Sequence, residues 1–331
     1  MNNRPKENVQ PNEAGIIADI VAGTIADQER DYKPGTLARR DVHSKSHGTF
    51  DDATFQIRPD ILIGCQVGLF AERGAVYPAV VRLSNGAPGV GPDALPNVRG
   101  IAIKVRTIPG AKLLVGDEAS DCCDFLLANH PVSFHKHLED YPPIRELMAK
   151  GKVGEVLKRF KPEGRLLLKA VLKLVKNPLK VAYFSQTPYK FGENRVVKYA
   201  LIPESRGWLA SFVDFICLPN LFDAAYLRHA AEKTLRKRAM KFTLCIQFQG
   251  ADDPIEDPSV QWDSPFVPLA TLTSPQRLVP LLESAGEPLS FNPWRTLPEH
   301  RPLGWVNRVR EAVYRADFMW RTKKNAENAA S

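Results

Sequence analysis

The sequence has few cysteines, no long apolar run and no internal repeat. Its 331 residues include five cysteines, an odd number at irregular spacing, which matches neither a disulfide framework nor a CxxC zinc site. No run of about 20 apolar residues could span a membrane, and the polar first fifteen residues lack the apolar core of a signal peptide. Without a repeat of about 20 to 50 residues, solenoids and propellers are excluded. We expect a soluble, cytoplasmic protein.

The overall composition is that of a globular protein. Hydrophobic residues make up 44% of the chain and charged residues 25%, so the chain can bury a core and is not disordered as a whole. The formal net charge is +8, from 45 basic and 37 acidic residues, which favours anionic partners in general. Basic clusters such as residues 236–238 lack the interleaved aromatic residues typical of single-strand binding, so we expect no nucleic-acid partner.

Short strand-like runs separated by Gly, Pro and Asn fill much of the chain. In one of them, Ile101, Ile103 and Val105 alternate with Ala102 and Lys104, which is the period of a half-buried strand. Closely spaced strands followed by helices, without βαβ alternation, predict an α+β fold with an antiparallel barrel or strongly curved sheet. The runs cover residues 48–57, 76–84, 99–106, 121–128, 195–202 and 241–249.

Helical periodicity occurs before, between and after these runs. Apolar residues at helical spacing follow Ile16 in an N-terminal segment, and a further helix is expected over 221–237. We divide the chain into an arm (1–31), a single domain (32–321) and a loose polar tail (322–331). The domain includes a helical insertion at about 135–185 and a terminal helix at about 302–321.

Five basic residues of the insertion are spaced for one stripe along a helix. The intervening residues are mostly Leu and Val. Such a stripe is typical of a solvated helix face, and it is also compatible with a weak contact between residues 165–180 and an anionic membrane surface. The residues are Arg165, Lys169, Lys173, Lys176 and Lys180.

Three separate clusters carry polar side chains suited to chemistry. Arg82 and Ser84 have the same parity on one strand, so both face one side of the sheet, and an inward-facing Arg there needs an anion. His43 and Arg40 lie just before the first strand, and Asn129 ends an apolar strand, where its carboxamide needs a partner.

The terminal helix carries a stripe of Arg310, Tyr314 and Arg321. At about 100° per residue these three side chains fall within roughly 40° of one another. An Arg one turn before a Tyr can stabilise the phenolate and lower its pKa. Arg321 lies about 10.5 Å further along the helix, at about 1.5 Å per residue, where it could reach the carboxylate edge of a flat ligand centred on the phenol oxygen.

Five ordered motifs resemble those of the haem catalase superfamily, and the chain is similar to its short, catalase-related peroxidases. The similarity extends from about residue 32 to residue 321. Each motif alone is a weak signal, whereas the ordered set has polar residues that all belong to one site. The motifs are R-x-x-H-x-K-x-x-G (40–48), V-R-x-S (81–84), V-R-G-x-A-x-K (98–104), A-N-x-P (128–131) and R-x-x-x-Y-x6-R (310–321).

The resemblance implies a catalase-like antiparallel β-barrel with helical insertions, a C-terminal helix that ligates haem, and haem b as the cofactor. His43 matches the distal histidine that moves a proton between peroxide oxygens, Ser84 the residue that orients its imidazole, and Asn129 the distal asparagine that orients peroxide. Tyr314 matches the proximal ligand of the haem iron, and Arg310 the Arg that holds this phenolate. The other matches are the propionate-binding residues Arg40, Arg82 and Arg321 and the channel valine Val42.

The activity implied by the resemblance is that of a haem peroxidase or catalase-type oxidoreductase. Such an enzyme cleaves the O–O bond of hydrogen peroxide or an organic hydroperoxide, with a small organic or lipid-like molecule as reducing substrate. Full catalases continue far beyond their proximal tyrosine, whereas this chain ends 17 residues after Tyr314. We therefore expect a less enclosed haem channel and, among homo-oligomers, a dimer in place of an interlocked tetramer.

Three other interpretations remain open on the sequence. The short chain and the basic segment 165–180 are compatible with a fatty-acid hydroperoxide isomerase or lyase. A non-enzymatic haem-binding protein would use the same proximal residues. A non-haem metal site could be formed by His130, His135 and His137, although no carboxylate motif completes that set.

Overall fold

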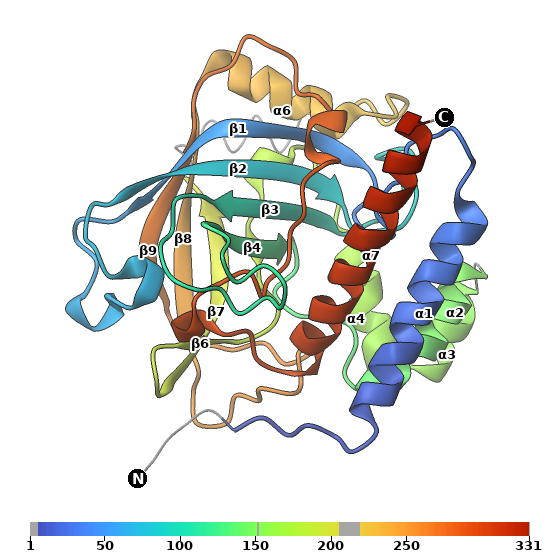
Figure 1. Ribbon diagram of the computed structural model, residues 1–331, viewed down its shortest axis with the longest axis horizontal. Coiled ribbons are helices and arrows are strands. Elements are labelled where there is room, and N and C mark those ends of the chain that lie inside the picture. Colours follow the sequence, from blue (N-terminus) through green and yellow to red (C-terminus); the bar gives the residue numbers. More distant parts are fainter. Residues whose placement is uncertain (1–5, 151, 205–218, 331) are drawn as a thin grey trace.

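A closed antiparallel β-barrel forms the centre of the molecule (Figure 1). The computed structural model describes residues 6–150, 152–204 and 219–330, so residues 1–5 of the predicted arm and 331 of the predicted tail lie outside the described residues. The ring closes where β1 pairs with β9 and β5 pairs with β7. The expectation of an α+β barrel is confirmed. Its eight strands are β1 (Ser46–Ile57), β2 (Val76–Asn85), β3 (Arg99–Val105), β4 (Cys123–Ala128), β5 (Tyr183–Phe184), β7 (Arg195–Pro203), β8 (Met240–Phe248) and β9 (Phe266–Ser274).

Apolar side chains fill the interior of this barrel. Leu83, Ile103 and Phe242 are fully or almost fully buried in one continuous apolar cluster. Because side chains alternate along a strand, the neighbours Arg82 and Ala102 point to the outer face. The barrel is therefore a packed core, and polar chemistry is confined to its outside.

Strand β9 was not predicted because Pro268 lies within it. Proline has no backbone N–H and is normally confined to edge strands or bulges. Here Pro268 pairs with Cys245 at a register shift that follows Leu244 in β8, so the irregularity accommodates it. Strands β5 and β6 (Tyr189–Phe191) contain only two and three residues, too few for a detectable alternation.

Five of the six helices in the described residues stand on one side of the barrel (Figure 1). α1 and α7 lie side by side, joined by an apolar cluster that includes Ile20, Trp305 and Val309. No helix in the described parts of the chain could span a lipid bilayer. The helices are α1 (Glu13–Asp31), α2 (Tyr141–Ala149), α3 (Val153–Arg159), α4 (Lys161–Val171), α6 (Tyr226–Lys237) and α7 (Trp305–Ala330), with α6 alone at another face.

The predicted basic stripe does not continue as one helix. α4 ends at Val171, and Pro178 begins a separate 3-10 turn after Asn177, whose side chain caps it. Leu172 is the C-cap of α4, so the stripe residues after it, Lys173, Lys176 and Lys180, no longer lie on the face of this helix. Only Arg165 and Lys169 of the stripe belong to α4.

The expected loose tail is wrong for residues 322–330, which are helical. α7 runs to Ala330 because its last turns are anchored to the segment after α1. Asn325 Oδ1 accepts from the Ala38 backbone N–H at 2.8 Å, and Asn328 Oδ1 accepts from the Tyr32 hydroxyl at 2.8 Å. These contacts join residues nearly 300 positions apart and leave no local trace in the sequence.

Candidate functional site

A cavity of about 660 Å³ lies between the outer face of the barrel and the surrounding helices. This volume is within the range of about 300–1,000 Å³ typical of small-molecule and cofactor sites. Of the nine residues that the resemblance assigns to a haem site, eight line it, and the exception is Asn129. The eight are Arg40, Val42, His43, Arg82, Ser84, Arg310, Tyr314 and Arg321.

Two rows of side chains across β2, β3 and β4 form the floor of the cavity. In one row Arg82 faces Ala102, which faces Leu126. In the next row Ser84 pairs with Gly100. Cross-strand neighbours share one face of the sheet, so the same parity that placed Arg82 and Ser84 together in the sequence brings both to this floor. The small residues on β3 leave space above it.

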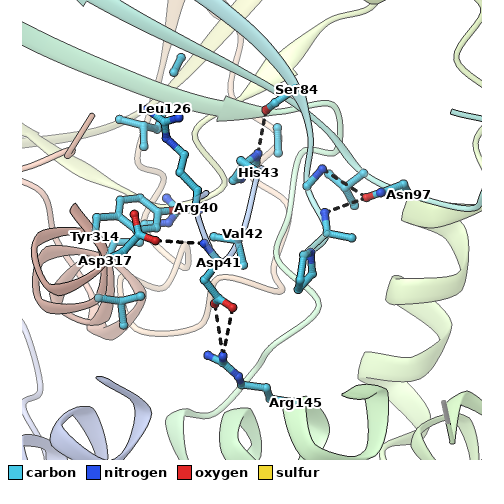
Figure 2. Close-up of a pocket in the computed structure, with 18 of the residues that line it drawn as sticks. Arg40, Asp41, Val42, His43, Ser84, Asn97, Leu126, Arg145, Tyr314 and Asp317 are labelled. Atoms are coloured by element: carbon cyan, nitrogen blue, oxygen red, sulfur yellow. Dashed lines mark hydrogen bonds and ion pairs between the residues drawn. The ribbon is translucent and has the colours of Figure 1, made fainter. Parts of the chain in front are cut away.

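His43 lies over this floor, with its imidazole held by Ser84 (Figure 2). Its Nδ1 is 3.0 Å from Ser84 Oγ, and its backbone N–H donates to the Gly86 carbonyl at 3.1 Å. The His43 backbone has a φ of 58°, in the left-handed region that costs a non-glycine residue about 1–3 kcal/mol. The surrounding contacts hold the ring in this place despite that cost.

The imidazole of His43 is electrically neutral at physiological pH. Burial, reinforced by the positive charges of Arg82, Arg310 and Arg40, lowers its pKa to about 3. Because Nδ1 is bonded to Ser84, Nε2 is the nitrogen left for a ligand. A neutral, oriented imidazole on a cavity wall is suited to accept a proton.

Gly100 leaves room for this imidazole. A Cβ at position 100 would lie 2.6 Å from both Cε1 and Nδ1 of His43. Overpacking of this kind typically costs about 1–3 kcal/mol, so Gly100→Ala is expected to displace the imidazole and to lower the free energy of unfolding by about that amount. Urea unfolding checks the prediction. Gly154→Ala is the matched control because a Cβ there meets nothing within 4 Å, and equal free energies of unfolding for the two variants would contradict it.

Tyr314 faces the cavity from α7 (Figure 2). Burial raises the pKa of its phenol, and the positive charge of Arg310 one turn earlier opposes that rise. Arg310 is itself held by the segment between β5 and β6, where Nη1 donates to Thr187 Oγ1 at 3.2 Å and Nη2 to Gln186 Oε1 at 3.4 Å. The arrangement offers a phenol oxygen beside a fixed cation.

Buried arginines gather at one end of the cavity. Burial, followed by repulsion from Arg82 and Arg321, lowers the pKa of Arg40 to about 9, and burial also lowers the pKa of Arg82. Within the described residues, Arg82 Nε and Arg39 Nη1 are buried without a hydrogen-bond partner. Cations that destabilise one another and retain unused donors form a site for an anion.

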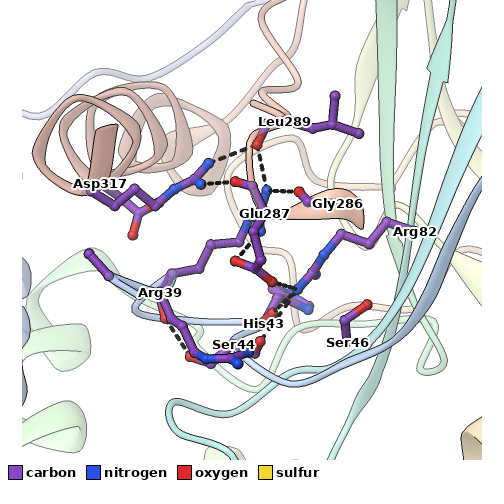
Figure 3. A network of polar contacts seen from close by, with 12 residues as sticks. Arg39, His43, Ser44, Ser46, Arg82, Gly286, Glu287, Leu289 and Asp317 are labelled. Carbon is purple, nitrogen blue, oxygen red and sulfur yellow. Dashed lines mark hydrogen bonds and ion pairs between the residues drawn. The ribbon is translucent and has the colours of Figure 1, made fainter. Parts of the chain in front are cut away.

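Glu287 partly neutralises this cluster (Figure 3). Its Oε2 lies 3.0 Å from Arg40 Nη1, and its Oε1 lies 3.4 Å from Arg82 Nη2. The backbone of the same segment accepts further hydrogen bonds, since Arg321 Nη2 donates to the Leu289 carbonyl at 2.7 Å. One carboxylate is shared between two guanidinium groups, so the cluster keeps a net positive charge.

Asp317 ties three elements together at the cavity wall. Its Oδ1 accepts from the Asp41 backbone N–H at 3.0 Å and from Gln28 Nε2 of α1 at 2.7 Å, and its Oδ2 accepts from Arg321 Nε at 3.1 Å. Asp41 also pairs with Arg145 of α2 at 3.2 Å (Figure 2). These contacts fix the segment that carries Arg40, Val42 and His43.

Asn129 is not brought to the cavity wall. Its Oδ1 accepts from the Arg99 backbone N–H at 2.7 Å, while its Nδ2 is buried without a hydrogen-bond partner in the described structure. The amide closes the end of the β3–β4 ladder, where Asn129 N–H donates to the Arg99 carbonyl. Its role in the cavity stays a prediction.

The three histidines considered for a metal site are dispersed. His130 Nδ1 bonds to the Val132 carbonyl at 2.9 Å, His135 lies between the rings of Phe134 and Tyr141, and His137 is exposed. Across the described ranges, no three His, Cys, Asp or Glu side chains converge on one point.

Sequence reasoning missed Glu287, Gly100, Asp317 and Arg145. Gly100 belongs to the V-R-G motif of residues 98–104, but the motif alone does not show what this glycine makes room for. The other three act through partners on distant segments, with Arg40 and Glu287 separated by 247 positions, and no local pattern indicates such contacts.

The fold matches catalases of known structure, although no family model and no curated protein matches the sequence. A bacterial catalase superposes with a TM-score of 0.63 at 16% identity, over 96% of this chain and 62% of that protein. A fungal catalase superposes with a TM-score of 0.59 at 16% identity, over 90% of this chain and 59% of that protein. Catalase A from Saccharomyces cerevisiae superposes with a TM-score of 0.58 at 15% identity, over 98% of this chain and 66% of that protein. The chain has a catalase-like fold and spans about three fifths of the length of these catalases.

Proposed function

We propose that this chain is a haem-dependent oxidoreductase that cleaves the O–O bond of hydrogen peroxide or an organic hydroperoxide. One observation carries the proposal: a single cavity holds a neutral His43 imidazole, a Tyr314 phenol beside Arg310, and a cluster of buried arginines. The catalase-like fold supports it.

The residues present fit haem b. Arg82, whose Nε has no hydrogen-bond partner in the described structure, and its neighbours Arg40 and Arg321 on the cavity wall suit the two propionates. Tyr314 would be the ligand of the iron, since phenolate oxygen is an established axial ligand of ferric haem. The remaining wall is largely apolar, as a flat macrocycle requires. Its apolar members include Val42, Ile101, Leu126, Phe291, Val313 and Phe318.

When bound, haem supplies the centre that stores the two oxidising equivalents released as the O–O bond breaks. His43 carries out the proton transfer. Its Nε2 accepts a proton from one peroxide oxygen and returns it to the other oxygen, the one that leaves, as the O–O bond breaks heterolytically. Water then leaves from hydrogen peroxide, or an alcohol from an organic hydroperoxide. Ser84 Oγ, 3.0 Å from Nδ1, orients the ring and leaves Nε2 for the peroxide. Two electrons and two protons from a reducing substrate complete the cycle.

The substitution Tyr314→Phe tests the assignment of the axial ligand. Removing the phenol oxygen is expected to weaken haem binding by at least about 10- to 100-fold, the loss typical of far milder changes around a metal site. Titration of the purified protein with haemin, followed by its Soret absorbance, gives the affinity and the spectrum.

Tyr77→Phe is the matched control, because Tyr77 lies on β2 outside the cavity lining. The native chain and this control should bind haemin with the same spectrum. Full haem occupancy with an unchanged spectrum in Tyr314→Phe would remove Tyr314 from the site. A native chain without any Soret band would overturn the proposed function as a whole.

Isomerisation of a fatty-acid hydroperoxide is the second candidate. It is favoured by the apolar side chains that α2 and α4 contribute to the cavity, Ile144, Met148, Leu167 and Val171. Peroxidase chemistry needs a reducing substrate, whereas isomerisation conserves both oxygens without one. Product analysis with a lipid hydroperoxide, with and without a reductant such as a phenol, separates the two reactions.

A further inference from the structure

The loop that joins β2 to β3 presents only apolar residues to solvent. In residues 86–97 the exposed positions are Ala, Pro, Gly, Val and Leu, and Val90 and Leu95 are 53% and 54% exposed. Asp93, the one charged residue of the loop, is turned inward, with its Oδ1 2.7 Å from the buried Lys45 Nζ. Surface loops are normally polar, and a contiguous exposed apolar patch marks an interaction site.

Two further exposed apolar segments adjoin this loop. The Asn97 backbone N–H donates to the Val171 carbonyl at 3.2 Å, which places Leu172, 60% exposed, beside the loop. The Asp93 backbone N–H donates to the Ala224 carbonyl at 3.0 Å, next to the fully exposed Phe222. We call these residues the apolar rim: Val90, Leu95, Leu172, Leu221 and Phe222.

Basic side chains accompany the rim along α4. Arg165, Leu168, Lys169 and Leu172 follow one another at intervals of three, one and three residues, so they share one face. All four are exposed, whereas Leu167 on the other face is buried. A helix face that mixes Leu with Arg and Lys is typical of segments that lie at the surface of an anionic bilayer.

The rim lies at the edge of the cavity. The segments that carry it also contribute cavity-lining residues: Pro88 and Pro96 from the loop, Leu167 and Val171 from α4. Met148 of α2 both lines the cavity and is 38% exposed. The apolar rim therefore adjoins segments that form part of the cavity wall.

We propose that the apolar rim and the outward face of α4 dock on an anionic phospholipid membrane, with the cavity facing the bilayer. The rim side chains insert among the acyl chains, and Arg165 and Lys169 contact the anionic headgroups. An amphiphilic substrate could then pass from the bilayer into the cavity without crossing water. The route rests on the proposed function, whereas docking itself requires no haem.

Co-sedimentation with phospholipid vesicles tests the docking. The native chain is expected to bind vesicles of phosphatidylcholine mixed with phosphatidylglycerol, and to release them at high salt because screening weakens the headgroup contacts. The double variant Val90→Ser/Leu95→Ser is expected to bind at least about tenfold more weakly, since it removes inserted apolar area. Arg165→Glu/Lys169→Glu is expected to lose the preference for these vesicles over pure phosphatidylcholine.

Leu62→Ser/Ile63→Ser is the matched control. Both residues are highly exposed, 61% and 79%. The segment between β1 and β2, to which they belong, lies on the opposite side of the barrel from α4 (Figure 1). This variant should bind anionic vesicles as the native chain does. Thermal unfolding of all variants, followed by circular dichroism, confirms that each remains folded.

The proposal is overturned if the native chain does not bind vesicles, or if Val90→Ser/Leu95→Ser binds them as well as the native chain does. If the native chain does not bind vesicles and is a dimer that Val90→Ser/Leu95→Ser converts to a monomer, the rim is instead an interface between two copies of the chain. Hydrogen peroxide turnover in vesicle-free solution is measured separately. Vesicle binding without turnover would overturn the proposed function and leave the docking intact.

Discussion

Replacing His43 with alanine is expected to slow peroxide cleavage by about 10²- to 10⁴-fold, the usual contribution of a positioned proton-transfer group, while haem binding persists. The imidazole is neutral because its pKa is about 3, and Ser84 Oγ at 3.0 Å from Nδ1 orients it. Without the His43 imidazole, the peroxide loses the base that would accept its proton. Rapid mixing of the haem-loaded protein with hydrogen peroxide measures the rate.

The matched control is His229→Ala. This histidine is paired with Asp223 at the protein surface and does not line the cavity, so its removal should leave the rate unchanged. A native rate in His43→Ala, at equal haem content, would exclude His43 from the mechanism. Because the His43 pKa is far below 6.5, the base stays unprotonated in the folded protein between pH 7 and pH 5, so the rate per folded molecule should not change over this range.

The second large effect is an acid-induced loss of stability caused by four histidines whose pKa is lowered in the folded protein. Burial lowers the pKa of His43 and His135 to about 3 and that of His47 and His300 to about 4. In the unfolded chain each imidazole titrates near 6.5. Between these values the unfolded state binds more protons than the folded state, so the free energy of unfolding falls as the pH decreases.

The stability contributed by these neutral imidazoles is fully present above about pH 6.5 and is lost as the pH falls toward 4 and 3. At pH 5 each one costs about 2 kcal/mol, at about 1.36 kcal/mol per pKa unit. The contribution of Asp41 has the opposite sign, because burial raises its pKa to about 6, and it offsets about 1 kcal/mol at pH 5. The net loss of about 7 kcal/mol is comparable to the total stability of a typical domain.

Urea unfolding at pH 7 and at pH 5 measures this loss. The variant His135→Phe should resist acid better than the native chain by about 2 kcal/mol at pH 5, since Nδ1 of His135 has no hydrogen-bond partner in the described structure and its ring lies between Phe134 and Tyr141. His137→Gln, at an exposed position, serves as the control with no change expected. A free energy of unfolding that is the same at both pH values would show that the buried imidazoles titrate normally.

The two central features of the candidate site could be predicted because they depend on local periodicity. A strand period of two places Arg82 and Ser84 on one face, and a helix period of 3.6 places Arg310, Tyr314 and Arg321 on one stripe. All five line the cavity. The wrong predictions have equally local causes. Pro268 interrupts the pattern by which strand β9 would have been predicted. The polar residues after 321 suggested a loose end, whereas Asn325 and Asn328 bond to the segment after α1 and the helix continues.

The amino-acid sequence alone determined the α+β class, the shared parity of Arg82 and Ser84 and the stripe on the last helix, because each of these follows from spacing along one strand or one helix. Only the tertiary structure decided that Glu287 neutralises Arg40 and Arg82, that Gly100 makes room for His43, and that the loop 86–97 turns its single charge inward beside the cavity. Those features depend on contacts between segments far apart in the chain, and such contacts arise only when the barrel closes and α7 packs against it.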